Sequence, residues 1–337
     1  MKTWRVAAGS GIEGLKTQTE PPAALGPTSV RVRLRAATLN YRDLMVLKGW
    51  YPVSGTGPLV PGSDGAGDVI ETGSAVTRFK VGDRVTTCFF PDWIEGRMSL
   101  PRIATALGAG GAGTLAEEVV LDERSLVATP AHLDYAQAAS LTCAGVTAWN
   151  ALFETGGLKP GQTVLLLGTG GVSIWALQLA RAAGVRAIIT SSSDAKLERA
   201  RSLGADALIN YTKNPEWSGE VRKLTGGEGV DVVLEVGGEK TAQQSLASVR
   251  MQGTVVIIGG VSGFGGAINP RSLIVGATRV QGVYVGSRQM HEDLARFVSG
   301  SKIAPVVDKV FAFGEAPEAY RHFEAGRHFG KVGVALV

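Results

Sequence analysis

The sequence has 337 residues, of which 45% are apolar and 19% charged, so it is long enough for about two domains with well-buried cores. The net charge of +4 is spread along the chain and gives no reason to expect a nucleic-acid partner; an anionic cofactor explains it equally well. Two cysteines exclude a disulfide framework, and the lack of an apolar leader or long apolar run predicts a cytoplasmic protein without a membrane segment.

Short strands separated by glycine and proline turns are predicted for the first third of the chain. Residues 30–36 alternate apolar and basic side chains, as a half-buried strand does. Gly82 and Asp83 form a hairpin-type turn between two apolar runs. This region therefore predicts an irregular, β-rich domain.

A helix over 133–152 precedes the strongest signal in the sequence, a glycine-rich turn between a strand at 163–167 and a helix. Another strand follows at 186–190. The glycines allow a sharp turn and let a pyrophosphate approach the free N–H groups at the start of the helix. Ser173 takes the third glycine position of this dinucleotide fingerprint and is small enough for close packing. The candidate contacts here are Gly168, Gly170, Gly171 and Val172.

The sequence predicts further strands at 230–235, 254–259 and 279–285, and helical stretches separate the first two. This alternation is typical of a parallel, doubly wound α/β sheet of the Rossmann kind. Such sheets bind ligands at the carboxyl ends of their strands, although plain strand-end turns would look the same. The candidate contacts in this part are Gly260, Val261, Tyr284 and Arg288. The remaining chain predicts a helix at 288–298, strands within 303–313, a helix at 316–324 and a final strand at 330–334.

Three motifs in this order carry a family resemblance: PLVPG-x-x-GAG-x-V from Pro58, V-x-x-F-K-V-G-D-R-V from Val76, and the glycine turn. Together they resemble the medium-chain dehydrogenase/reductase superfamily over nearly the whole chain. The resemblance implies a GroES-like catalytic domain at 1–128, completed by 288–337, and a Rossmann domain at 129–287. It also implies a homodimer.

Two of the three zinc-ligand positions of the zinc enzymes in this superfamily are changed. Asn40 stands where those enzymes carry Cys, Ser63-Asp64 stands where they carry His-Glu, and only Cys143 matches. A catalytic zinc needs about three protein ligands, and Cys88 is the one cysteine where a structural zinc would need four. We therefore expect no metal site. The segment from Asn40 to Asp43 resembles the zinc-free, quinone oxidoreductase-like branch of the superfamily.

Without zinc, hydride transfer is easier to an acceptor whose negative charge is delocalised, which favours a quinone or an α,β-unsaturated carbonyl as the small-molecule substrate. The candidate catalytic residues are Asn40, which could orient a ligand, Tyr51, which could donate a proton, and Asp43. The alternatives are that Asp43 is structural and that Tyr51 simply packs. Residues 89–113 are expected to form a surface loop that affects substrate choice.

The end of the second nucleotide-binding strand indicates the type of cofactor. NAD-binding proteins carry an acidic residue about 20 positions after the glycine turn, whereas here serines occupy 191–193. A 2′-phosphate would meet no carboxylate there, so we expect NADP(H) rather than NAD(H), with Ser192, Lys196 and Tyr211 as contacts. The alternative is that Ser192 or Ser193 caps the next helix. By the family resemblance, Thr147 is a candidate nicotinamide contact; a plain core position is equally compatible.

Two other functions are compatible with the sequence. A zinc-type alcohol dehydrogenase with unusual ligands would bind one zinc per chain. An NADPH-binding protein with a regulatory or RNA-related task would bind cofactor without turnover, although the sequence has no basic cluster. The four histidines have no ligand spacing and are expected at the surface.

Overall fold

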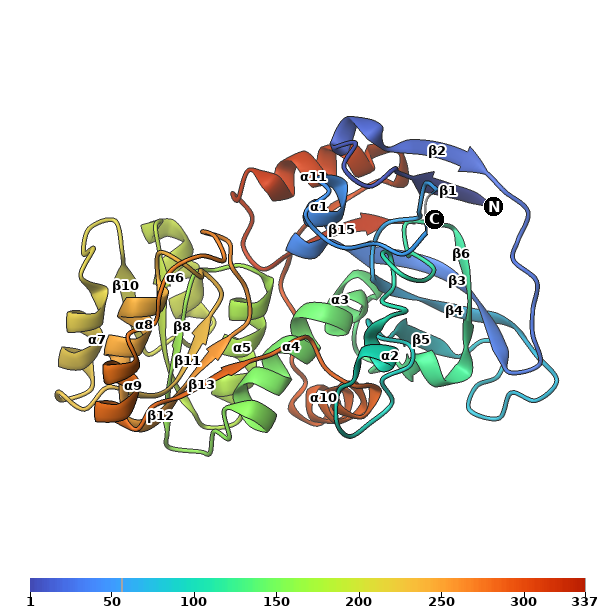
Figure 1. The fold of residues 1–337 in the computed structure, drawn as a ribbon. Helices are drawn as coiled ribbons and strands as arrows, with labels where there is room; N and C mark the ends of the chain where they lie inside the picture. Colours follow the sequence, from blue (N-terminus) through green and yellow to red (C-terminus); the bar gives the residue numbers. More distant parts are fainter. Residues whose placement is uncertain (56, 337) are drawn as a thin grey trace. The chain divides into compact units, whose positions relative to one another are not determined.

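The structure, a computed structural model, describes residues 1–55 and 57–336 and divides into two compact units. The first unit consists of Met1–Val146 and the chain from Val285 onward, and the second of Thr147–Tyr284 (Figure 1). The family resemblance implies boundaries after residues 128 and 287. The first boundary lies later in the structure because helix α3 (Tyr135–Ala139) packs against β3, β4 and β5 of the first unit.

A seven-stranded sheet forms the core of the first unit, with the order β14-β15-β3-β4-β5-β7 and with β6 paired to β3. All its neighbouring strands are antiparallel except β14 and β15. A separate hairpin joins β1 (Lys2–Arg5) to β2 (Lys16–Thr19). The strands of the sheet are β3 (Ser29–Thr38), β4 (Asp64–Thr72), β5 (Arg84–Thr87), β6 (Glu118–Asp122), β7 (Leu126–Ala128), β14 (Val307–Phe311) and β15 (Lys331–Ala335).

Strand β3 shows why this sheet forms. Its alternating pattern buries Val30, Val32 and Leu34, whose side chains are at most 1% exposed, while Arg33 between them is exposed. Each such burial stabilises the fold by about 1.5–3 kcal/mol. The helices of this unit are α1 (Tyr41–Leu47), α2 (Leu100–Ile103), α3, α10 (Arg288–Ser301) and α11 (Ala316–Glu324), with short 3-10 turns at Ile12–Gly14, Glu123–Ser125 and Phe313–Glu315.

The second unit is a six-stranded, fully parallel sheet with the order β10-β9-β8-β11-β12-β13. This is the Rossmann order, with its topological switch point between β8 and β11, and it confirms the predicted fold class. Helices α5 and α6 contact the strands β8 to β10, and α8 and α9 contact β11 and β12 (Figure 1). The elements are β8 (Thr163–Leu166), α5 (Gly171–Ala182), β9 (Arg186–Ser191), α6 (Asp194–Ser202), β10 (Ala207–Asn210), α7 (Trp217–Leu224), β11 (Val230–Glu235), α8 (Ala242–Ser248), β12 (Val249–Ile257), α9 (Pro270–Gly276) and β13 (Arg279–Gly282).

The helix expected over 133–152 is interrupted. After α3 the chain forms a π-helical segment, η3 (Leu141–Gly145), then α4 (Val146–Trp149) and a second π-helical segment, η4 (Asn150–Thr155). The apolar periodicity of a π-turn differs too little from that of an α-helix to be read from the sequence. π-Helical turns occur frequently at functional sites, and η3 carries Cys143.

Within the described part of the chain, no helix has the length and apolar character needed to cross a membrane.

Candidate active site

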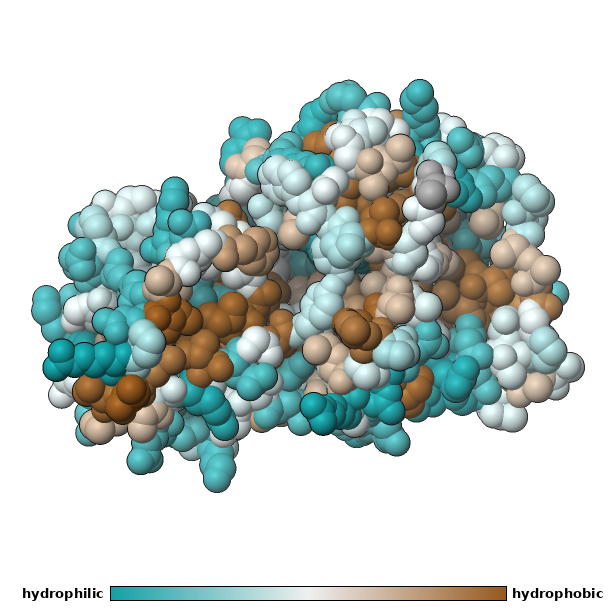
Figure 2. Space-filling model, viewed as in Figure 1, coloured by the Kyte–Doolittle hydropathy of each residue, from teal (hydrophilic) through white to brown (hydrophobic). Residues whose placement is uncertain are grey.

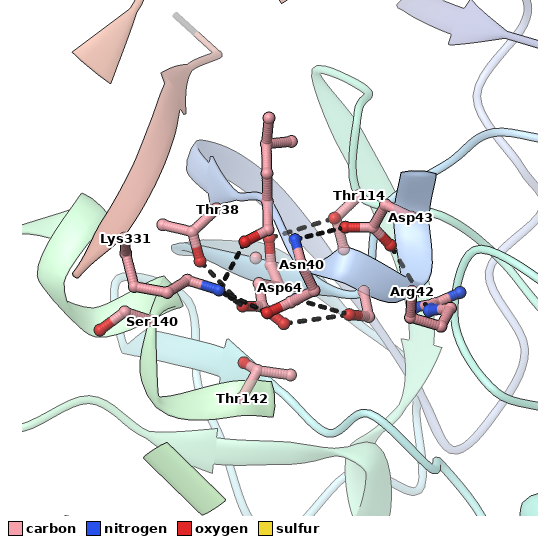
Figure 3. A network of polar contacts seen from close by, with 12 residues as sticks. Thr38, Asn40, Arg42, Asp43, Asp64, Thr114, Ser140, Thr142 and Lys331 are labelled. Atoms are coloured by element: carbon pink, nitrogen blue, oxygen red, sulfur yellow. Dashed lines mark hydrogen bonds and ion pairs between the residues drawn. The ribbon is translucent and has the colours of Figure 1, made fainter. Parts of the chain in front are cut away.

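A buried lysine lies at the centre of a polar network in the first unit (Figure 3). Lys331, the first residue of β15, is 2% exposed, and its Nζ donates to the backbone O of Leu39 at 2.8 Å. It also donates to Oδ1 of Asn40 at 2.5 Å and to Oδ2 of Asp64 at 3.0 Å. An ammonium group has three N–H donors. These three acceptors therefore use all of them, and the buried charge is fully paired.

Asp64, the first residue of β4, is the counter-ion of this lysine and has no exposed surface. Its Oδ2 also accepts from Oγ1 of Thr38 at 2.8 Å, and its Oδ1 accepts from Oγ of Ser63 at 3.0 Å. Thr38 is the register partner of Asp64 in the β3–β4 pairing, so the sheet itself brings these two side chains together. The carboxylate is therefore held in one position from several sides.

Asn40 precedes helix α1 and presents its amide to the lysine. Because an ammonium group can only donate, the amide atom that faces Lys331 must be the oxygen Oδ1. The amide nitrogen Nδ2 is left with one long contact, 3.4 Å to Oγ of Ser63. Asn40 is 7% exposed, and a hydrogen bond of 3.4 Å is weak. Nδ2 therefore keeps unused donor capacity.

Asp43 is held inside the first turn of α1. Its Oδ2 accepts from the backbone N of Asn40 at 2.9 Å, and its Oδ1 lies 3.5 Å from Nε of Arg42. Burial raises the pKa of the Asp43 carboxyl above its usual range, and the neighbouring Arg42 charge only partly opposes this effect. Asp43, 1% exposed, is therefore the N3 residue of a capping box whose N-cap is Asn40.

Arg42 fixes the surroundings of Tyr51, the candidate proton donor. The guanidinium lies over the rings of Phe89 and Tyr51, at 4.6 Å and 5.6 Å from their centroids, and donates to the backbone O of Leu107 at 2.7 Å. Both Phe89 and Leu107 belong to the segment 89–113. Arg42 therefore joins helix α1 to that segment.

The start of the 89–113 segment is part of the core, whereas a surface loop was expected. Phe89, Phe90 and Trp93 are at most 5% exposed, and the carbonyl groups of Trp93 and Ile94 accept from the backbone N of Arg288 and Gln289, both at 2.9 Å. Only its middle, with Met98 and Leu100, exposes large apolar side chains.

The residues at the three family zinc positions do not fit a zinc ion. Oδ1 of Asn40 is already bound by a cation, the ammonium of Lys331, which would repel a second cation at the same oxygen. Ser63 offers a neutral hydroxyl that donates to Oδ1 of Asp64, so Cys143 is the one residue of the usual ligand type among the three, whereas a catalytic zinc needs about three protein ligands. Among residues 1–55 and 57–336, no group of three His, Cys, Asp or Glu side chains could hold a metal ion.

His291 is buried, contrary to the expectation that all four histidines lie at the surface. Its ring is 1% exposed, its Nε2 lies 3.3 Å from Oγ1 of Thr86, and its Nδ1 has no hydrogen-bond partner in the structure. Burial lowers the pKa of His291 to about 4, although the charge of Asp64 acts in the opposite direction. The imidazole is therefore neutral at pH 7.

The glycine turn in the second unit has the geometry that a pyrophosphate needs. Gly168 has φ +72°, a backbone conformation that favours glycine, and its N–H donates to Oγ1 of Thr190 at 3.2 Å. Gly170 precedes helix α5, and a Cβ built on it would meet open space. Gly171 and Val172 begin the helix, so their N–H groups are unpaired within it. A dinucleotide fits this turn.

The candidate contacts for a 2′-phosphate come from neighbouring strand ends. Ser192 follows β9, and Tyr211 follows β10 and donates its backbone N–H to the O of Ser191 at 3.1 Å. Lys196 lies in the first turn of α6, which Ser193 caps by accepting from the backbone N of Lys196. The capping interpretation is therefore correct for Ser193 and leaves Ser192, which is exposed, without that role.

Glu235, the last residue of β11, organises another strand end of the same sheet, a role that no sequence pattern indicates. This carboxylate has no exposed surface and accepts from the backbone N of Gly237 at 2.6 Å and of Gly238 at 2.9 Å. It also accepts from Oγ1 of Thr241 at 2.7 Å and Oγ of Ser245 at 2.5 Å. Gly237 and Gly238 therefore form a turn that is built around this buried carboxylate.

The remaining cofactor candidates lie in both units. Gly260 and Val261 follow β12, with Gly260 buried and Val261 60% exposed. Thr147, 3% exposed, and Tyr284, partly buried, are the first and last residues of the second unit. Arg288 belongs to the first unit, where its Nε pairs with Glu292 at 3.3 Å.

Comparison with known proteins gives two matching family models, the alcohol dehydrogenase GroES-like domain over residues 26–131 and the zinc-binding dehydrogenase over residues 171–300. A zinc-type alcohol dehydrogenase-like protein of Schizosaccharomyces pombe is 44% identical over 96% of this chain and 95% of its own length. A quinone oxidoreductase of Pseudomonas aeruginosa is 34% identical over 98% of both chains.

Solved structures agree in fold. A Sinorhizobium meliloti protein assigned as an alcohol dehydrogenase superposes with a TM-score of 0.93 at 40% identity, over 99% of this chain and 98% of its own. An NAD-dependent alcohol dehydrogenase gives 0.92 at 35% identity over all of both chains, and a mycobacterial protein complexed with NADPH gives 0.84 at 26% identity over 99% of this chain and all of its own. These relatives support a nicotinamide cofactor and do not decide between its two forms.

Proposed function

The chain belongs to the medium-chain dehydrogenase/reductase superfamily, and on that premise we propose that it is a zinc-independent, NADPH-dependent reductase of quinones or α,β-unsaturated carbonyl compounds. The observation that carries the proposal is the side-chain set at the family zinc positions. There an amide at position 40 and a hydroxyl at position 63 stand in place of two metal ligands, and a lysine ammonium binds the amide oxygen.

The chemistry of the acceptor follows from that set. When bound, the nicotinamide cofactor supplies a hydride to the acceptor carbon, and negative charge develops on the acceptor oxygen. In a simple ketone that charge stays on one oxygen, which zinc stabilises as a Lewis acid. In a quinone or an enone it is delocalised, and a neutral donor such as Nδ2 of Asn40 stabilises it sufficiently. A proton from water then completes the reduction.

The preference for NADPH rests on the absence of a carboxylate at the end of β9. Ser192, which is exposed, and Lys196 supply a hydroxyl and an ammonium group, which are suitable partners for a phosphate dianion. The first acid, Asp194, already pairs with Lys213, whose Nζ lies 2.5 Å from its Oδ2. A 2′-phosphate therefore meets little uncompensated negative charge.

A homodimer is also part of the proposal. Helix α9 has no buried residue in the single chain. Its apolar side chains Ile274 and Val275 are 78% and 65% exposed. Apolar atoms gather over α9 in Figure 2. Strand β13 is the edge of its sheet. Phe264, which lies between β12 and α9 in the chain, is 75% exposed. Exposed apolar surface beside an open strand edge suits a second copy of the chain.

Sedimentation of the variant Ile274→Asp tests this part. We expect it to dissociate at concentrations where the natural chain is dimeric, while Leu100→Asp, at an 81% exposed apolar residue of the first unit, stays dimeric. A natural chain that sediments as a monomer contradicts the dimer.

The reaction is tested by following NADPH oxidation at 340 nm on metal-assayed protein with a quinone, an enone and a simple aldehyde, and by repeating the series with NADH. We expect metal-free turnover of the quinone or the enone that is faster with NADPH. Aldehyde reduction that requires added zinc would instead support a zinc-type alcohol dehydrogenase. Cofactor binding without turnover of any acceptor would contradict a reductase of this type.

A further inference from the structure

We propose that Lys331 is a positioning residue that fixes the amide of Asn40 in one orientation, so that Nδ2 of Asn40 acts as the hydrogen-bond donor to the substrate oxygen. The inference rests on the proposed function for the substrate, but its structural half, the control of the amide by the lysine, stands on contacts within the first unit alone. Figure 3 shows the residues concerned.

Orientation matters because an asparagine amide has two ends with opposite chemistry. Rotating it by a half-turn exchanges the acceptor Oδ1 for the donor Nδ2 with almost no change in shape. Only the donor end stabilises a developing oxyanion, since the acceptor end would repel it. An amide free to turn would therefore spend part of its time in an orientation that opposes the reaction.

The lysine removes this freedom. Its Nζ lies 2.5 Å from Oδ1 of Asn40, and in the reversed orientation it would face the N–H groups of the amide, donor against donor. The hydrogen bond involves a charged donor, which makes it about twice as strong as a neutral one. Lys331 cannot turn away, because its other two donors are held by Leu39 and Asp64.

Lys331 itself does not contact the substrate in this arrangement. All three of its N–H groups are used, and it is 2% exposed. It therefore acts through Asn40. Asp64 balances its charge and is in turn held by Thr38 and Ser63. The same contacts explain why a zinc ion does not fit here, because the ammonium of Lys331 already supplies a positive charge at Oδ1 of Asn40.

The test is a double-mutant cycle of Asn40→Ala and Lys331→Met, with kcat and KM measured for the best acceptor. Loss of one oxyanion donor costs about 10²–10³ in kcat, so we expect Asn40→Ala to lower kcat by about 100-fold and Lys331→Met by about 10- to 100-fold. KM for NADPH should stay within about twofold, since neither change touches the glycine turn. The double variant should be no slower than Asn40→Ala, because Lys331 acts only through Asn40.

A matched control separates positioning from general damage to the buried layer. Thr114→Val removes a buried hydroxyl that donates to the backbone O of Asp64 at 3.1 Å, and not to Lys331 or Asn40. It should lower the melting temperature and leave kcat unchanged. Equal losses of kcat in Thr114→Val and Lys331→Met, or additive losses in the cycle, would overturn the inference. Lys331→Arg, which keeps the charge and the donors, should recover part of the lost kcat.

A second readout does not depend on turnover. The side-chain NH₂ cross-peak of Asn40, identified by its disappearance in Asn40→Ser, should move in Lys331→Met and stay in place in Thr114→Val. If the natural chain reduces no acceptor, the proposed function fails while this shift still supports the hold of Lys331 on the amide. If the cross-peak does not respond to Lys331→Met, the hold itself is refuted, whatever the activity.

Discussion

The hydroxyl of Ser173 donates to the backbone O of Leu167 at 2.7 Å. This bond joins the first turn of helix α5 to the residue that directly follows β8. Ser173 is 2% exposed. In the dinucleotide fingerprint its position is usually glycine or alanine. The serine therefore replaces a bare close contact with a hydrogen bond across the same turn.

Removing that hydroxyl should weaken the fold without affecting cofactor binding. We expect Ser173→Ala to lower the free energy of unfolding by about 1 kcal/mol, the usual value of one hydrogen bond, and to leave the dissociation constant for NADPH unchanged, since alanine also satisfies the fingerprint. Urea denaturation and cofactor fluorescence measure the two quantities. Ser202→Ala, which removes an exposed hydroxyl with a similar bond of 2.8 Å, serves as control and should cost less. A large loss of NADPH affinity in Ser173→Ala would contradict this account.

Glu235→Gln should be strongly destabilising. The carboxylate accepts four hydrogen bonds, from Gly237, Gly238, Thr241 and Ser245, and the amide of glutamine would point N–H groups at some of these donors. A buried group left without its partner costs about 1–3 kcal/mol, and more where a charge is involved. We therefore expect a loss of about 3 kcal/mol in the free energy of unfolding, measured by urea denaturation.

The control for this prediction is Glu198→Gln, at a side chain that is 65% exposed. Exposed ion pairs contribute about 0–1 kcal/mol, so this variant should remain close to the natural chain. Similar stabilities for the two variants would show that the turn after β11 does not depend on the Glu235 carboxylate.

His291 predicts a loss of stability in mild acid. Its pKa is about 4 in the folded chain, compared with 6.5 for an ordinary histidine, because burial disfavours the charged ring. Between about pH 4 and pH 6.5, His291 is therefore protonated in the unfolded chain and neutral in the folded chain. The free energy of unfolding thus falls as the pH drops from about 6.5 to about 4. Above pH 6.5 both states are neutral at this residue, and the effect disappears.

The variant His291→Gln isolates this contribution, because glutamine can still contact Thr86 but does not titrate. Urea denaturation at intervals between pH 7 and pH 4 should give a smaller decline for the variant than for the natural chain, with a difference in slope of at most about 1.4 kcal/mol per pH unit. Parallel curves would mean that His291 has an ordinary pKa in the folded chain.

Cofactor choice should respond to a carboxylate placed at the end of β9. A charge near the 2′-phosphate interacts with it by about 1–4 kcal/mol. We therefore expect Ser192→Asp to weaken NADPH binding by at least about tenfold and to change NADH binding little. Ser202→Asp makes the same charge change at the far end of α6 and should leave both affinities unaltered. If Ser192→Asp binds NADPH as the natural chain does, the phosphate is held elsewhere.

The fold was largely predictable because its signals are local. The apolar run before Gly168, the turn and the helix after it lie within 20 residues, and the strands at 230–235 and 186–190 have plain apolar patterns. Strand β10 was missed because it is only four residues long and has no glycine turn after it. The π-helical segments were missed because their periodicity resembles that of an α-helix.

The site was predictable only in part because its contacts are distant in sequence. Asn40 and Asp64 were identified by their unusual residue types at family positions, but Lys331 is 291 residues from Asn40 and 267 from Asp64. A lysine in a strand reads as an exposed residue, and only the folded sheet shows that it is buried. Glu235 reads as an ordinary strand residue for a different reason: its partners are close in sequence, but no sequence pattern shows that the hydroxyls of Thr241 and Ser245 turn back toward it.

Strand β15 has a consequence for the order in which the protein can assemble during synthesis. It pairs with β3 near the start of the chain, but the ribosome adds its residues only after the whole second unit. Until then β3 of the nascent first unit has an open edge, and the carboxylate of Asp64 lacks the cation that it pairs with in the complete fold. The Rossmann unit can fold while still attached to the ribosome, whereas the amide–lysine pair forms only after β15 has left the exit tunnel.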